Sequence, residues 1–161
     1  MFAALLCVLS PIALPIGPIP ISMGLLGVLL ASVFLPPTTA LASVAIFLAL
    51  GACGIPVFGG GMGGATVLAG PTGGYLWAYL LASPLVSWLC GKASCFFRIF
   101  LACLSGVALC YLCGTLQFIW VTHTPFPSAL TLTVLPFLPF DILKALLASY
   151  LGKKLKDRIQ I

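Results

Sequence analysis

The stretch from residue 134 to residue 150 reads VLPFLPFDILKALLASY. It is apolar almost throughout, yet it contains Asp141 and Lys144, whose i, i+3 spacing would place them on one face of a helix. An ionisable side chain within a membrane span costs about 2.5–3.5 kcal/mol on insertion scales and indicates a functional site. The alternative is that an acid at a helix start favours the helix dipole and the lysine only neutralises it.

The composition of the whole chain shows that this stretch belongs to a membrane protein. Of 161 residues, 62% are hydrophobic and 6% are charged, and the mean hydropathy is +1.28. Soluble domains carry about 25% charged residues, so this chain cannot cover a surface that faces water. The apolar residues run continuously and do not alternate as they do in a membrane β-barrel. The composition therefore predicts an all-α, polytopic membrane protein.

Clusters of Pro and Gly divide the chain into six expected transmembrane helices, which together form a single domain over residues 1–161. The expected spans are 2–16, 21–35, 40–53, 71–89, 99–121 and 139–157. The first apolar stretch has no basic start and no small-residue cleavage site. We therefore expect it to be a span and not a removable signal peptide.

The basic residues predict the orientation of these spans. They fall after the last span and in the connection between the fourth and fifth spans, at Lys92, Arg98, Lys153, Lys154, Lys156 and Arg158. Cytoplasmic connections are rich in Lys and Arg, so both clusters and both termini are expected in the cytoplasm. The connections 17–20, 54–70 and 122–139 then face outward. Asp141 would lie just below the outer surface, which predicts an outward-facing ligand pocket.

A glycine-rich connection, GIPVFGGGMGGATVLAG (54–70), precedes Pro71. It lacks the Gly-Lys-Ser/Thr of a nucleotide-binding loop, so we expect no binding of ATP. Two interpretations remain for the glycines. They could form a close-fitting wall of the pocket, beside the free N–H groups of a helix that starts at Pro71. They could instead provide a flexible loop and close helix packing through Gly70 and Gly74.

Other chemistry finds no support in the sequence. The seven cysteines include one isolated Cys110-x-x-Cys113 pair, and His123 is the single histidine. We expect the cysteines to be small packing residues, with no metal site, no cofactor and no catalytic set. The net charge of +5 comes mainly from the basic cluster after the last span. That position indicates the lipid bilayer as the partner, not nucleic acid.

Three motifs are similar to those of the BioY family, the biotin-binding S components of energy-coupling factor (ECF) vitamin transporters. Residues 54–76 resemble G-L-P-V-F-x-G-G-x-G-G-x-x-x-L-x-G-P-T-G-G-Y-L, and residues 136–144 resemble P-F-L-P-G-D-x-x-K. PIPISMGLLGVLLA (18–31) resembles the opening motif P-x-P-x-T-L-Q-T-L. The chain departs from the family at Phe140, where Gly is usual, at 22–24, where Thr-Leu-Gln is usual, and at 37–39, where a basic residue is common.

The resemblance implies a biotin site. Asp141 would accept hydrogen bonds from the ureido N–H groups, and Lys144 would donate to the ureido oxygen. Aromatic side chains would pack on the rings and the valeryl chain of the ligand. The remaining residues expected to bind biotin are Phe58, Gly70, Thr72, Gly73, Gly74, Tyr75, Trp77 and Tyr79.

The resemblance also implies partners, namely a membrane coupling protein and two ATPase subunits in the cytoplasmic membrane of a prokaryote. Ala3 and Cys7, which form a small-xxx-small pair, are the expected contact with the coupling protein. Two alternatives remain for the function: an S component for another vitamin, or a membrane scaffold subunit without a ligand. A membrane enzyme would need a catalytic base or a metal set, and the sequence offers neither.

Overall fold

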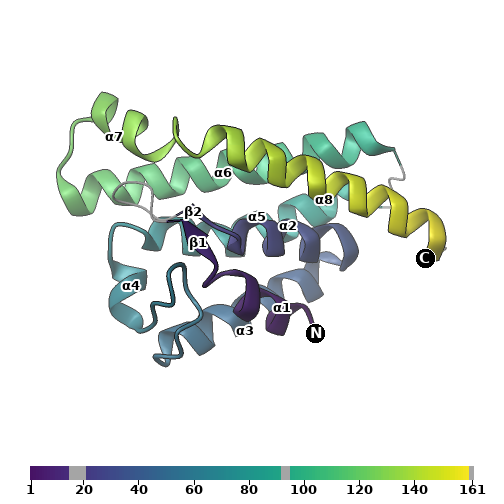
Figure 1. Cartoon of the computed structure of the whole chain (residues 1–161), viewed down its shortest axis with the longest axis horizontal. Helices are drawn as coiled ribbons and strands as arrows, with labels where there is room; N and C mark the ends of the chain where they lie inside the picture. Colours follow the sequence, from purple (N-terminus) through teal and green to yellow (C-terminus); the bar gives the residue numbers. More distant parts are fainter. Residues whose placement is uncertain (15–20, 92–94, 160–161) are drawn as a thin grey trace.

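The computed structural model describes residues 1–14, 21–91 and 95–159, of which 156–159 are described by their backbone alone. The described residues form helices joined by short connections, together with one two-stranded antiparallel sheet (Figure 1). The helices are α1 (Phe2–Leu9), α2 (Gly24–Phe34), α3 (Pro37–Ala52), α4 (Ala65–Ala69), α5 (Gly73–Cys90), α6 (Phe96–Thr122), α7 (Phe126–Thr133) and α8 (Leu138–Ile159). The strands are β1 (Ala13–Leu14) and β2 (Ile21–Ser22).

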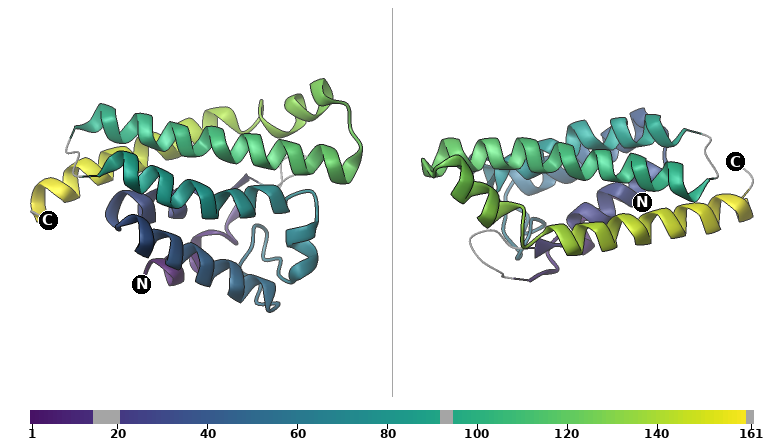
Figure 2. Two further views of the ribbon diagram at one scale, coloured as in Figure 1. Left: turned by 180° about the vertical axis from the view of Figure 1, so that it is seen from behind. Right: turned by 90° about the horizontal axis from the view of Figure 1, so that it is seen from above.

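The longer helices pack side by side around a common core. In Figures 1 and 2, α6 and α8 lie next to each other, α5 and α2 lie against them, and α3 and α1 lie on the far side. The sheet, α4 and α7 gather at one end of these helices (Figure 1). Both termini lie toward the opposite end (Figure 1). The two ends of the molecule therefore differ in construction, with the irregular segments collected at one of them.

The prediction of a mostly helical chain is confirmed, and each of the six expected segments contains a helix. The predicted length of the first span was wrong. Helix α1 ends at Leu9, and the chain turns through Ser10 and Pro11 into the strand β1. Pro11 has no N–H to donate to a preceding turn, so the helix cannot continue through it. The two-stranded sheet was not expected from the sequence, and the expected connection 17–20 lies outside the described residues.

The predicted start of the fourth span was also wrong. Pro71 and Thr72 form a turn, and α5 begins at Gly73. The N–H of Gly73 donates to the carbonyl oxygen of Gly70, 3.0 Å away, so the turn satisfies the first of the free donors at this helix end. The connections 54–70 and 122–139, expected to be loops, contain the short helices α4 and α7.

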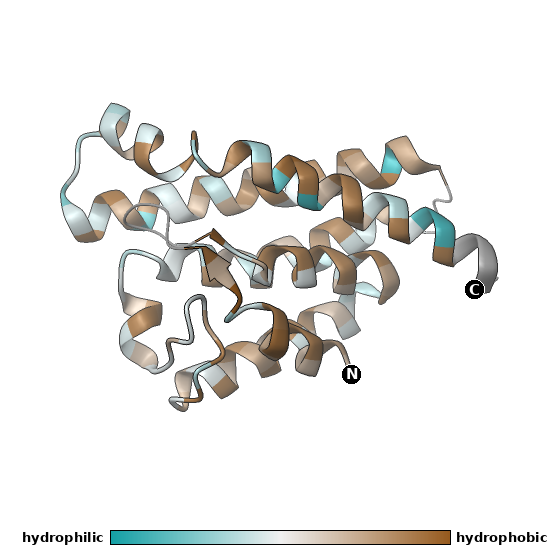
Figure 3. Cartoon of the chain, viewed as in Figure 1, coloured by the Kyte–Doolittle hydropathy of each residue, from teal (hydrophilic) through white to brown (hydrophobic). Residues whose placement is uncertain are grey.

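Several described helices have the character of membrane helices. α6 is long and apolar enough to cross a bilayer, and α7 with α8 would make a second span that bends by 50°. α2 and α3 are apolar but shorter. Large side chains such as Trp88, Leu112 and Trp120 are exposed along the helices. Figure 3 shows hydrophobic residues distributed along most of the helical ribbon. An apolar surface of this kind fits lipid and not water.

Small residues let the helices approach one another in the core. A Cβ atom at Gly106 of α6 would meet the side chain of Val86 at 2.5 Å, and one at Gly152 of α8 would meet Val33 at the same distance. Cys103 and Cys110 are also buried among apolar side chains on α6. Close backbone approach through small residues is typical of helix packing in membranes. This packing places α5, α6 and α8 around the candidate functional site at Asp141 and Lys144.

Candidate functional site

The site is built around an ion pair on the first turns of α8. Asp141 lies in the first turn of this helix, and Lys144 follows on the same face. The Nζ atom of Lys144 is 2.8 Å from the Oδ1 atom of Asp141. Asp141 is only 3% exposed and Lys144 only 6%. Two charges this deeply buried are stable only when they are paired and hydrogen-bonded, so their other contacts decide the character of the site.

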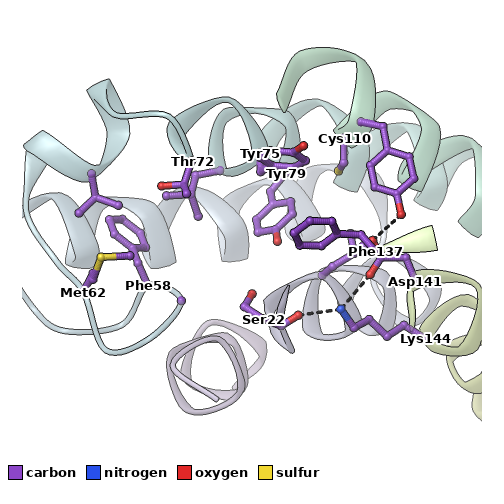
Figure 4. Close-up of a pocket in the computed structure, with 15 residues that line it drawn as sticks. Ser22, Phe58, Met62, Thr72, Tyr75, Tyr79, Cys110, Phe137, Asp141 and Lys144 are labelled. Carbon is purple, nitrogen blue, oxygen red and sulfur yellow. Dashed lines mark hydrogen bonds and ion pairs between the residues drawn. The ribbon is translucent and has the colours of Figure 1, made fainter. Parts of the chain in front are cut away.

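Two further hydrogen bonds connect the pair to other parts of the fold. Lys144 donates from Nζ to the carbonyl oxygen of Ser22 in β2, at 2.8 Å. The hydroxyl group of Tyr111 in α6 donates to the Oδ2 atom of Asp141, also at 2.8 Å. Figure 4 marks these bonds with dashed lines that meet at Asp141 and Lys144. The network therefore joins β2, α6 and α8 and carries no net charge.

A pocket opens beside this network, with an empty volume of about 650 Å³ that includes its open mouth. The ion pair and Ser22 lie at one end, and Phe58 and Met62 lie at the other (Figure 4). The walls between them are mainly apolar or aromatic. They comprise Leu25, Gly59, Val67, Thr72, Tyr75, Leu76, Tyr79, Cys110, Tyr111 and Phe137. An apolar cavity with a few converging polar groups is the usual form of a small-molecule site.

Six of the residues expected from the sequence line this pocket: Phe58, Thr72, Tyr75, Tyr79, Asp141 and Lys144. Two of the aromatic rings pack directly against glycines, each on a different neighbouring helix. A Cβ atom at Gly51 of α3 would overlap the ring of Phe58, and one at Gly114 of α6 would overlap the ring of Tyr75. The Tyr75 hydroxyl donates to the carbonyl oxygen of Thr133 in α7, at 3.2 Å. These contacts fix both rings in the pocket wall.

The other expected residues lie outside the pocket lining. Trp77 is 47% exposed, and its Nε1 atom donates to the carbonyl oxygen of Leu68 at 3.2 Å. Gly73 lies against that same carbonyl oxygen, and Gly74 lies against the carbonyl oxygen of Cys113 in α6.

Gly70 is held by a hydrogen bond from a neighbouring helix. The Nε2 atom of Gln117 in α6 donates to the carbonyl oxygens of Gly70, at 2.9 Å, and Leu68, at 3.0 Å. At Gly70, Gly73 and Gly74 the contacts therefore agree with the packing interpretation of the glycine-rich segment. The side chain of Thr72, within the same turn, faces the pocket.

The glycine-rich connection contributes to the pocket through a tight reversal of the chain. Phe58 and Met62 pair across it, and the N–H of Phe58 donates to the carbonyl oxygen of Met62 at 2.9 Å. Gly60 and Gly61, at the tip, have φ angles of 76° and 73°, a conformation that glycine adopts most readily. The reversal brings Phe58, Gly59 and Met62 into the lining of the pocket.

Sequence reasoning missed several residues of the lining. Tyr111 lies in the middle of the apolar α6, where no charge distinguishes it, and the Cys110-x-x-Cys113 pair that brackets it was interpreted as packing only. Phe137 lies within the motif of residues 136–144, but it was not among the residues expected to bind the ligand. Ser22 belongs to the 18–31 stretch that resembles the family, so a signal for its neighbourhood was present. Its contribution to the ion pair comes from the backbone, which a sequence motif does not identify.

The residues expected at the surface lie outside the pocket lining. Ala3 and Cys7 are half-buried on α1, which packs against α2 and α3. Arg98, Lys153 and Lys154 are exposed, whereas the side chains of Lys92, Lys156 and Arg158 lie outside the described residues. Over the described part of the chain, His, Cys, Asp and Glu do not gather in threes as a metal site would need.

Comparisons with known proteins identify the family and similar chains. A model of the BioY family matches residues 1–161. The biotin transporter BioY2 of Lactococcus lactis subsp. cremoris (strain MG1363) is 37% identical over 153 residues, which cover 93% of this chain and 83% of that protein. The biotin transporter BioY of Thermotoga maritima is 32% identical over 156 residues, 97% of this chain and 92% of that one.

A solved structure is similar as well, the crystal structure of the S-component for biotin from an ECF-type ABC transporter. The TM-score is 0.90 at 30% sequence identity, and the match covers 97% of this chain and 87% of the other. The fold is therefore that of a membrane transporter component and not that of an enzyme. The chain belongs to the BioY family, and the resemblance seen in the sequence is confirmed.

Proposed function

We propose that this chain captures biotin as the substrate-binding S component of a vitamin transporter. The observation that carries the proposal is the buried network of Tyr111, Asp141, Lys144 and the Ser22 carbonyl oxygen at one end of an apolar pocket. The relatives named above are biotin transporters, and the similar solved structure is an S component for biotin.

The hydrogen-bonding groups left open in this network match a cyclic urea. A carboxylate has about four lone-pair positions, and Tyr111 and Lys144 use one on each oxygen of Asp141. Lys144 has three N–H donors, and Asp141 and Ser22 accept from two of them. Among the residues that the structure describes, these bonds leave carboxylate lone pairs open next to one open ammonium donor. A cyclic urea presents an N–H group beside its carbonyl oxygen, so both groups can bind on one edge.

The rest of the pocket suits the apolar part of the same ligand. Phe58, Tyr75, Tyr79 and Phe137 surround the space that continues away from the ion pair. Aromatic side chains bury large apolar areas and would pack on the sulfur-containing ring and the valeryl chain. Thr72, which follows the glycine-rich connection, adds a polar side chain to this part of the pocket wall. In this arrangement the ureido head lies at Asp141 and the carboxylate tail points toward Met62.

The proposed setting is the cytoplasmic membrane of a prokaryote. We propose that residues 1–161 form one domain that crosses the bilayer six times, with the pocket facing outward and both termini in the cytoplasm. The position of both termini toward one end of the helices supports an even number of crossings (Figure 1). The exposed Arg98, Lys153 and Lys154 support a cytoplasmic location for the ends that carry them.

Active transport requires partners in this proposal. The sequence contains no nucleotide-binding loop, so energy would come from two ATPase subunits through a membrane coupling protein that contacts Ala3 and Cys7 on α1. Vesicles that contain only this chain should then not accumulate biotin when ATP is supplied on either side. ATP-driven accumulation by the chain alone would contradict the requirement for partners.

A competition experiment tests the choice of ligand. The purified chain in detergent should bind labelled biotin, and excess thiamine or riboflavin should not displace it. Displacement by another vitamin at a lower concentration than biotin would favour an S component for that vitamin. Absence of saturable binding to any of them would favour the scaffold interpretation.

A further inference from the structure

We infer that Tyr111 is a positioning residue, which fixes the carboxylate of Asp141 in the orientation that receives the ligand. This inference rests on the proposed function of the Asp141–Lys144 pair. Tyr111 is a half-buried side chain of α6 whose hydroxyl group lies 2.8 Å from the Oδ2 atom of Asp141. Tyr111 and Asp141 are 30 residues apart in the sequence, so no local motif connects them.

The carboxylate group of Asp141 needs contacts from outside its own side chain to fix its orientation. The terminal torsion of an aspartate side chain has a broad energy minimum, so the plane of the group is poorly fixed by the side chain itself. Lys144 holds only Oδ1, and it is attached to the same helix as Asp141. Tyr111 holds the other oxygen from a different helix. Two donors on opposite oxygens, fixed by separate helices, define the plane of the carboxylate.

The ring of Tyr111 is itself held in place by the packing of the core. Its ring packs against both apolar clusters of the fold, the large one around α2, α3, α5 and α6 and the smaller one that contains Ile21 and Phe137. A hydroxyl group carried on such a ring has little freedom to move. The hydroxyl group of Tyr75, also in the pocket wall, donates to the Thr133 carbonyl oxygen and not to Asp141. Tyr111 is the tyrosine whose hydroxyl group donates to the Asp141 carboxylate.

The Asp141 carboxylate keeps lone pairs with which it can accept hydrogen bonds from a ligand. With Tyr111 and Lys144 in place, one lone-pair position stays open on each oxygen of Asp141. A carboxylate that is already oriented loses less entropy when a ligand binds, which raises affinity. Removing the Tyr111 hydroxyl would leave Asp141 in the pocket but would let its carboxylate rotate. Binding should weaken although no ligand contact has been deleted.

The test compares three variants of the full chain in detergent, with Asp141→Asn as the reference for the third, by equilibrium binding of labelled biotin and by thermal unfolding. Tyr111→Phe keeps the ring and removes the hydroxyl group, and we expect it to weaken biotin binding by about tenfold, within the range for a hydrogen bond to a charged group. Tyr150→Phe is the matched control, because Tyr150 is 57% exposed and lies on α8 outside the pocket lining. It should leave affinity unchanged within about twofold.

A third variant separates positioning from direct contact. In an Asp141→Asn background the carboxylate is absent, so adding Tyr111→Phe should change affinity by less than about threefold. A larger change there would show that Tyr111 contacts the ligand itself, and would overturn the inference. A lower melting temperature for Tyr111→Phe with unchanged affinity would overturn it as well, because it would show a purely structural role. Failure of the unchanged chain to bind biotin would refute the proposed function and this inference together.

Discussion

Replacing both members of the buried ion pair should separate its structural role from its role in binding. Lys144→Met keeps most of the length of the side chain and removes the ammonium group. Asp141→Asn keeps the shape of the carboxyl group and removes its charge. The third variant combines both changes. Lys153→Met is the matched control, since Lys153 lies on the same helix and is exposed.

The structure gives the expected magnitudes. Asp141 is 3% exposed in the unchanged chain, and Lys144→Met would remove the cation with which its carboxylate pairs. Removing one member of a buried pair costs about 3–5 kcal/mol of stability. In the double variant neither charge remains, and replacement of a whole buried pair is often neutral or stabilising, so much of that stability should return. Affinity should not return, because each lost charge-assisted hydrogen bond to the ligand removes about 1.5–3 kcal/mol, or about 10- to 150-fold.

Two measurements on the same purified samples decide the outcome. Thermal unfolding in detergent should rank the double variant above both single variants. Equilibrium binding of biotin should show the double variant to be as weak as the single variants or weaker, with the Lys153→Met control close to the unchanged chain. Affinity within about threefold of the unchanged chain in all variants would remove the pair from the binding site. Recovery of affinity together with stability would show that the pair acts only on folding.

Three other predictions follow from the topology, the packing and the charge of the site. In a version of the chain without its own cysteines, a membrane-impermeant thiol reagent added from outside should label Thr124→Cys and spare Lys154→Cys; the reverse pattern would refute the outward-facing pocket. Gly114→Ala should lower the melting temperature and weaken biotin binding, because its Cβ atom would overlap the Tyr75 ring, and overpacking costs about 1–3 kcal/mol; an unchanged affinity would contradict a role for that ring. Biotin amide, whose tail is neutral, should bind within about tenfold of biotin, because the Asp141–Lys144 pair has no net charge to attract a carboxylate; a larger loss of affinity would require a cationic contact for the tail.

Much of the helical content could be predicted from the sequence, because apolar runs between Pro and Gly clusters have few alternatives in a membrane. The pair at Asp141 and Lys144 could be predicted for a similar reason. Two charges in the otherwise apolar stretch of residues 134–150 are costly enough to require an explanation. Their spacing also fixes their geometry, since residues three apart share a helix face. Their contact at 2.8 Å is the result of that local rule.

The remaining features depend on contacts between distant parts of the chain. Tyr111 reaches Asp141 only because α6 packs beside α8, and Ser22 reaches Lys144 across 122 residues through its backbone. The sequence alone does not show whether the glycines near the start of α5 face a ligand or a neighbouring helix. In the structure, the side chain of Gln117 and nearby carbonyl oxygens lie against Gly70, Gly73 and Gly74, which supports the packing interpretation for these three glycines. Hydrophobic pattern and local motifs contain no information on such pairings.

Equilibrium binding of labelled biotin to the purified chain in detergent, measured beside the Asp141→Asn/Lys144→Met double variant, tests the central claim most directly. The unchanged chain should show saturable binding that unlabelled biotin displaces, and the double variant, still folded by its thermal unfolding curve, should bind at least about tenfold more weakly. Equal binding by the two proteins, or no saturable binding by the unchanged chain, would contradict the proposal that this buried pair recognises biotin.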